Sequence, residues 1–196
     1  QDAGAAYVFV RNGSTWSQQA YLKASNAGVN DSFGSSVSIS DDTIVVGAPM
    51  EDSSQTFITN GGGAGSDDAA PNAGAAYVFA RNGSTWSQEA YLKPSAGGAN
   101  DYFGSSVSIS NDTIVVGALG EDSNGTDAGA VYVFVHDGSS WWQEAHFTAF
   151  NAGPGDYFGS SVSISDDTIV VGAYGDDSNG PDAGAAHVFV RDGGGW

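Results

Sequence analysis

Two acidic loops carry the residues best suited to hold a metal ion. Each places carboxylate and amide oxygens at short spacing around a glycine, Gly125 in one loop and Gly180 in the other. Hard oxygen ligands on a tight turn suit Ca²⁺, although no Glu stands at the twelfth position that an EF-hand requires. The alternative is a solvated turn whose Asp and Asn side chains cap their own backbone. Calcium is the one cofactor that the sequence suggests. The candidate ligands are Glu121, Asp122, Asn124, Asp127, Asp176, Asp177, Asn179 and Asp182.

A second set of acids recurs at one fixed place. Asp31, Asp101 and Asp156 each lie two residues before a Phe-Gly pair. Catalytic carboxylates belong to one asymmetric site, whereas an acid that returns in every repeat has a structural task. We therefore expect these side chains to accept backbone N–H bonds where the chain passes from one repeat to the next.

Catalytic chemistry has little support. Each of the three histidines stands where other copies of the repeat carry Tyr or Arg, and cysteine is absent. A nucleophile, base and acid cannot be assembled from these residues. Paired carboxylates of the glycosidase type are the least favoured alternative, and we expect that the chain is not an enzyme.

The aromatic residues divide into two groups. Trp16, Trp86, Trp141 and Trp196 share one repeat position, which favours packing between repeats. Trp142 instead stands where the other copies have Ser. Because it follows Trp141 directly, strand alternation turns its side chain to the face opposite that of Trp141. We expect it to be exposed. The candidate ligand-binding aromatics, which could stack on sugar rings, are Trp142, Tyr102, Tyr157 and Tyr174.

These residues are spaced around a segment that occurs three times, at 33–49, 103–119 and 158–174. Each copy has two runs rich in Val, Ile and Thr on either side of a Ser-Asp/Asn-Asp turn, which predicts a β-hairpin. We expect its Phe to be buried between sheets and the Gly of its Gly-Ala step to allow close backbone approach. These structural positions are Phe33, Phe103, Phe158, Gly47, Gly117 and Gly172.

Asn-Gly or Asp-Gly steps between further β runs complete four short antiparallel strands for each repeat. The chain then contains two, four, four and three strands in succession, which predicts an all-β fold of β-propeller type with about three four-stranded blades. All 196 residues form a single repeat region, with a loop insertion within 51–71. A closed propeller has about four to eight blades. We therefore expect a part of a longer chain, a subunit that completes the ring by self-association, or an open stack of blades.

The Phe33-Gly34 pair followed by Gly47-Ala48-Pro49 resembles the FG-GAP repeat of integrin α-subunit propellers and of many extracellular proteins. The resemblance implies a propeller that acts in adhesion or binding outside the cell. Leu119 and Tyr174 replace the final Pro in the later copies. Many members carry an Asp-x-Asp-x-Asp-Gly calcium loop between the first two strands, but here that connection is short, so the usual calcium site is not carried over.

The charge limits the partners. Five Lys and Arg against 23 Asp and Glu give a net charge of −18, which repels nucleic acid. No apolar run is long enough to insert into a membrane. We expect a non-enzymatic extracellular or cell-surface module that binds a protein or glycan, adheres or serves a structural role, with its site in the variable loops, 51–71 above all. The alternatives are a lectin-like propeller and a self-assembling subunit of a ring or filament.

Overall fold

The computed structural model describes residues 3–193 and 195–196, and this part of the chain is all-β. Its fourteen strands are β1 (Ala6–Asn12), β2 (Thr15–Leu22), β3 (Ser36–Ser40), β4 (Thr43–Ala48), β5 (Thr59–Asn60), β6 (Ala75–Asn82), β7 (Thr85–Leu92), β8 (Phe103–Ser110), β9 (Thr113–Ala118), β10 (Ala130–His136), β11 (Trp141–Phe147), β12 (Phe158–Ser165), β13 (Thr168–Ala173) and β14 (Ala185–Val190). These residues contain no helix long and apolar enough to cross a membrane.

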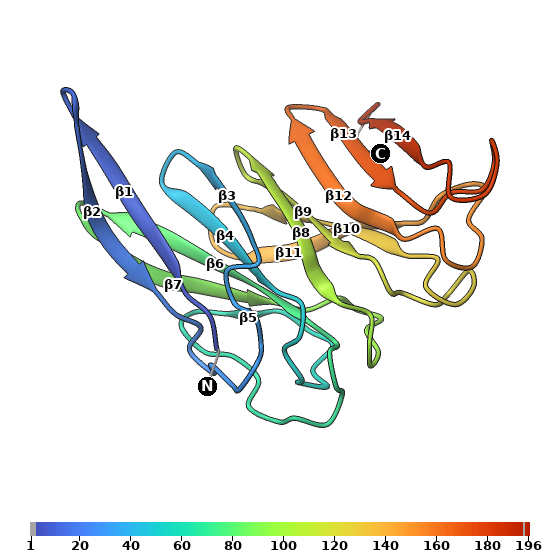
Figure 1. The fold of residues 1–196 in the computed structure, drawn as a ribbon. Coiled ribbons are helices and arrows are strands. Elements are labelled where there is room, and N and C mark those ends of the chain that lie inside the picture. Colours follow the sequence, from blue (N-terminus) through green and yellow to red (C-terminus); the bar gives the residue numbers. More distant parts are fainter. Residues whose placement is uncertain (1–2, 194) are drawn as a thin grey trace.

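The strands form four separate antiparallel sheets, which fan out in chain order (Figure 1). We call them blade A (β1–β2), blade B (β3, β4, β6, β7 and β5), blade C (β8–β11) and blade D (β12–β14). Within each blade, strands that follow one another in sequence lie side by side, apart from β5, which is the outer strand of blade B. The predicted propeller-type blades are therefore confirmed, and they do not close into a ring.

Local sequence explains the hairpins of every blade. Between the first two strands of a blade, Asp41, Asn111 and Asp166 adopt φ of 48°, 52° and 49°. Asn and Asp tolerate this left-handed conformation better than other non-Gly residues. Between the third and fourth strands of blades A and B the loop has two residues, Gly13-Ser14 and Gly83-Ser84. The Gly of each Asn-Gly step has positive φ, and Asn12 pairs with Thr15 in the ladder.

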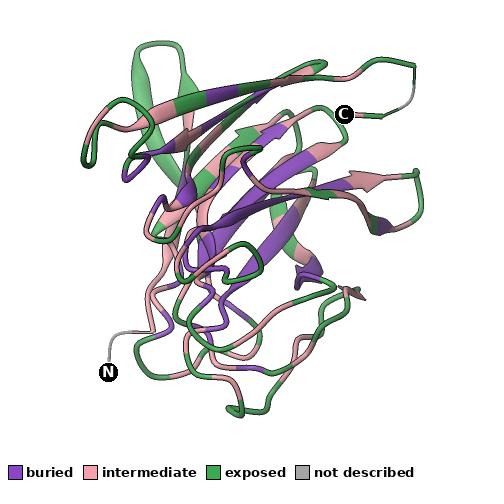
Figure 2. Cartoon of the chain, turned by 90° about the vertical axis from the view of Figure 1, so that its right-hand side faces the viewer, coloured by how far each residue is buried: buried purple, intermediate pink, exposed green. Residues whose placement is uncertain are grey.

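The blades pack face to face, with three apolar clusters at the contacts. Val8 and Leu22 of blade A pack with Tyr77 and Phe79 of blade B. Equivalent clusters join blades B and C and blades C and D. Figure 2 shows that buried residues are concentrated in the middle strands of the stack. Each inner blade therefore has one apolar face toward the preceding blade and one toward the following blade.

Serines of the repeated hairpin connect neighbouring blades. The Ser38 hydroxyl accepts a bond from the Ile109 N–H at 3.2 Å, and the Ser108 hydroxyl accepts one from the Ile164 N–H at 3.1 Å. The Ser36 hydroxyl donates to the Gly104 carbonyl at 2.8 Å. The Ser-x-Ser alternation thus directs hydroxyls to the following blade and Val or Ile side chains to the preceding one.

The Phe-Gly and Gly-Ala steps meet between blades. Phe33, Phe103 and Phe158 are buried and contact aromatic rings of the third strand edge-on. A Cβ atom on Gly47 would lie 2.0 Å from the Gly104 carbonyl oxygen, and one on Gly117 would lie 2.0 Å from that of Gly159. For Gly172, in the last blade, the nearest atom is instead the Ser161 hydroxyl, at 2.3 Å.

The insertion within 51–71 contains a strand that the sequence did not predict. β5 pairs with β7, and the Asn60 side chain reaches blade C. There its amide donates to the Trp141 carbonyl at 3.3 Å, and its Oδ1 accepts from the Trp141 N–H at 2.8 Å. At the start of the insertion, buried Glu51 forms an ion pair with buried Lys93 at 3.1 Å. The insertion is thus in part a structural connection between blades.

Candidate functional site

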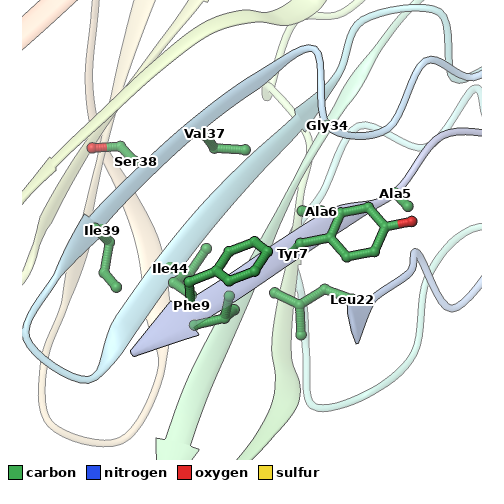
Figure 3. A pocket seen from close by; sticks show the side chains of 11 residues that line it. Ala5, Ala6, Tyr7, Phe9, Leu22, Gly34, Val37, Ser38, Ile39 and Ile44 are labelled. Carbon is green, nitrogen blue, oxygen red and sulfur yellow. The ribbon is translucent and has the colours of Figure 1, made fainter. Parts of the chain in front are cut away.

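An apolar groove lies between β1 of blade A and β3 of blade B. Its volume is about 460 Å³, and Figure 3 shows lining side chains contributed by both strands. β1 pairs with β2 along one edge only, whereas the equivalent strands β6 and β10 are paired along both edges. The groove therefore combines apolar side chains with a strand edge whose backbone groups are available for pairing.

The groove residues can be compared with identical residues elsewhere in the chain. Val37 and Ile39 are 59% and 58% exposed, whereas Val107 and Ile109, at the same positions of blade C, are 8% and 6% exposed. Val107 and Ile109 pack in one cluster with Val45 of the preceding blade. The exposure in the groove thus reflects the absence of a neighbouring sheet face at this place among the described residues.

Sequence reasoning did not identify this groove. The alternation of Val37 and Ile39 with serines predicts that the two side chains share one face of a strand, and the structure confirms this. The same pattern occurs in all three hairpins, however, and it does not say which copy lacks a covering blade. Exposed aromatic side chains extend the apolar surface over the outer face of blade A, at Tyr7, Phe9, Trp16 and Tyr21.

The two predicted calcium loops use their carboxylates on their own backbone. Asp122 accepts a bond from the Asp127 N–H at 2.8 Å, and Asp177 accepts one from the Asp182 N–H at 2.7 Å. Gly125 and Gly180 adopt φ of 134° and 129°, so the two loops have the same turn. Asn124 donates to Thr148, and Asn179 is exposed. This geometry is that of the self-capped turn.

The first acid of each loop is buried. Glu121 accepts bonds from the Ser123 N–H and hydroxyl. Asp176 accepts from the Ser178 N–H at 2.9 Å and from the Asn151 amide at 2.6 Å. Hydrogen bonds from Ser178 hold the pKa of Asp176 below its ordinary value. Within residues 3–193 and 195–196, no three His, Asp or Glu side chains are grouped so as to hold a metal ion. Calcium binding stays a prediction.

The recurring acids bind the backbone just before the Phe-Gly step. The carboxylates of Asp31, Asp101 and Asp156 accept the N–H of the glycine three residues earlier at 2.6, 2.7 and 2.7 Å. All three side chains are buried. Burial, together with the nearby charges of Glu121 and Asp122, raises the pKa of Asp101 to about 6.

The candidate ligand-binding aromatics do not form one site. Tyr157 and Tyr174 stack with ring centroids 4.9 Å apart, and Tyr174 is exposed. Tyr102 lines a separate, shallower pocket with Pro49, and Trp142 is 45% exposed on β11. The structure therefore brings together only two of the four residues.

The tryptophans at the shared position hydrogen-bond across blades. The indole N–H of Trp86 donates to Gln19 at 2.8 Å, and that of Trp141 donates to Glu89 at 3.0 Å. Trp196 donates to Glu144 at 2.9 Å. Each acceptor lies three residues after the Trp of the preceding blade. Trp16 belongs to blade A, which has no preceding blade among the described residues, and its side chain is exposed.

Comparison with known proteins agrees with the blade structure. A family model described as FG-GAP repeat matches residues 16–79, 86–134 and 141–189, so each match runs from a shared-position Trp into the third strand of the next blade. A search of curated proteins finds no match to the chain. Because the family model covers most of the sequence in three successive units that coincide with the packed hairpins, the chain belongs to the FG-GAP repeat family.

Proposed function

We propose that this chain is a non-enzymatic interaction module of an extracellular or cell-surface protein, and that it binds a β-structured partner by strand addition at the groove between β1 and β3. The observation that carries this proposal is the exposure of Val37 and Ile39, whose counterparts Val107 and Ile109 are buried by a neighbouring sheet. Strand addition obtains affinity from main-chain hydrogen bonds and specificity from pockets for alternate side chains.

Two further observations support this role. FG-GAP repeats typically belong to extracellular or surface proteins that bind or have structural roles, and three units match here. In addition, five of the acids accept N–H bonds from the backbone of their own turns: Asp31, Asp101, Asp156, Asp122 and Asp177. An exposed apolar patch next to a free strand edge is the kind of surface that proteins use to bind other proteins.

The groove should accept a further copy of the repeated hairpin, because hairpins of the preceding blade cover the equivalent positions in blades C and D. A labelled synthetic peptide of residues 158–173, titrated with the full chain and followed by fluorescence anisotropy, is expected to bind saturably with one peptide per chain. Val37→Asp should abolish binding, since it places a charge in the apolar groove. Val188→Asp, a matched change at an exposed strand valine of blade D, should leave binding intact. Binding that survives Val37→Asp would refute the proposed site.

A second candidate function, glycan binding, rests on the stacked pair of Tyr157 and Tyr174. Exposed aromatic rings offer flat apolar faces to sugar rings. A glycan array probed with the full chain tests this candidate. Saturable binding should be lost in Tyr174→Ala and kept in Tyr7→Ala, which truncates an exposed tyrosine elsewhere. Equal loss in both variants would exclude a site at the stacked pair.

A further inference from the structure

We infer that the partner which fills the groove is a second copy of this chain, and that the two copies exchange strands: β1 of one copy takes the place of β14 beside β13 of the other. The β12–β13 hairpin of the second copy then lies in the groove between β1 and β3. This inference rests on the proposed interaction role and specifies its partner.

The two strands that would exchange are nearly the same in sequence. β14 reads Ala-Ala-His-Val-Phe-Val, and residues 5–10, which include most of β1, read Ala-Ala-Tyr-Val-Phe-Val. β14 pairs with β13 in the register Val188 with Val170 and Val190 with Thr168. Val8 and Val10 stand at the corresponding positions of β1. β13 can therefore form the same ladder with either strand, and β1 additionally brings β2 as the fourth strand of blade D.

The β1–β2 hairpin also carries the residues through which blade D contacts blade C. Phe189 stacks on Phe147 with ring centroids 4.6 Å apart, and Arg191 and Trp196 both donate to Glu144. At the positions of Phe189, Arg191 and Trp196, β1 and β2 carry the same residues: Phe9 and Arg11 on β1, and Trp16 on β2. Phe9 and Trp16 are exposed in the single chain, and exchange would place them in this interface.

One position favours the exchanged strand over β14. His187 is buried, and its Nε2 has no hydrogen-bond partner. The other blades have Tyr at this place, and the Tyr77 hydroxyl donates to Asn26 Oδ1 at 2.6 Å. By the repeat, Tyr7 would replace His187 and Asn151 would correspond to Asn26. Exchange therefore removes the buried His187 nitrogen that lacks a hydrogen-bond partner. In its place it brings the Tyr7 hydroxyl, with the Asn151 amide as its partner.

The serine contacts between blades continue across the new interface. Ser161, Ser163 and Ser165 of β12 are exposed, whereas their counterparts in blades B and C are half-buried by bonding to the next blade. In β3, the Ile39 N–H stands where the Ile109 and Ile164 N–H groups receive a serine oxygen, and no serine partner is found for it in the described part of the chain. β12 of the second copy would supply Ser163 to this N–H.

The number of blades agrees with a closed dimer. After exchange, blade A completes blade D of the other copy, so the described residues of each copy contribute three complete blades. Two chains make six, within the range of about four to eight blades that closed propellers adopt, whereas three chains would exceed it. Closure forms two identical interfaces at once and leaves neither groove open. A head-to-tail contact of this kind forms a ring when the rotation that relates one copy to the next closes.

The test traps the exchanged pair in a chain that has no cysteine of its own. In Val8→Cys/Val170→Cys, the two thiols lie opposite each other only after exchange, at the spacing of directly paired strand residues, which suits a disulfide. Oxidation should give a covalent dimer, and peptide mapping by mass spectrometry should show the 8–170 link. In the control, Val170→Cys/Val188→Cys, the disulfide forms within one chain, locks β14 in place and should keep the protein monomeric by light scattering.

The inference is overturned if Val8→Cys/Val170→Cys stays monomeric, or links only 170 to 170, under conditions that oxidise the control. Should Val8→Cys prevent folding, Val10→Cys with Thr168→Cys tests the same ladder one step further along. The proposed function is judged separately. If the peptide of residues 158–173 binds the groove but no 8–170 link forms, strand addition stands and the second copy is not the partner.

Discussion

The exposure of the groove can be measured with a pair of substitutions at equivalent positions. Ile39 and Ile109 occupy the same place in hairpins of identical strand sequence, opposite Ile44 and Ile114. Ile39 is 58% exposed and Ile109 is 6% exposed. Ile→Ala at both sites changes strand propensity equally, because strand, register and neighbours in sequence are the same. The difference between the two costs therefore reports burial by the neighbouring blade.

The expected magnitudes follow from that burial. Truncating a buried Ile to Ala costs about 2–5 kcal/mol, because the apolar contact is lost and a cavity remains. Truncating a mostly exposed Ile costs roughly 0.5–1 kcal/mol, since little surface is removed from water in the first place. Ile109→Ala should therefore lower the free energy of unfolding by at least about 1 kcal/mol more than Ile39→Ala.

Urea unfolding followed by circular dichroism measures both free energies, at a protein concentration where light scattering gives the mass of one chain. The slope m should be similar in the two variants, so that the midpoints can be compared directly. Costs that agree within about 0.5 kcal/mol would refute the reasoning, because the two positions would then be equally buried in solution. At concentrations where exchanged dimers form, the cost of Ile39→Ala should rise toward that of Ile109→Ala.

Three further predictions concern the acids and the insertion. Because burial raises the pKa of Asp101 to about 6, the folded state binds this proton more tightly than the unfolded chain does, and stability falls as the pH rises from about 4 to about 6. Asp101→Asn should therefore stabilise the fold by about 1–3 kcal/mol at pH 7 and lose that advantage below pH 4, as measured by urea unfolding; a pH-independent effect would contradict the assignment. EDTA should leave the melting temperature unchanged, since Asp122 and Asp177 already accept bonds within their own turns; a fall in melting temperature that calcium reverses would instead establish the calcium site. Asn60→Ala should cost about 1–2 kcal/mol through the two lost bonds to the Trp141 backbone, and a cost near zero would show that β5 does not stabilise the blade contact.

The strand pattern was predictable from the sequence because its causes are local. Alternation of Val37 and Ile39 with serines, the Asp41 turn and the repeated Gly steps each act within a few residues. Repetition then predicts blades, since a unit that recurs must pack against its own copies. The buried Phe positions follow in the same way, because they stand at one place in every unit.

Only the tertiary structure decided how identical segments differ. Val37 and Val107 have the same neighbours in sequence, and one is exposed while the other is buried, because burial depends on the neighbouring blade. The partner of Asn60 lies in another blade, so no local signal pointed to it. The sequence by itself therefore determined the fold and the repeating unit of this FG-GAP protein. Its candidate site depends on the order in which the units stack and on which sheet face is left uncovered, and packing sets both of these.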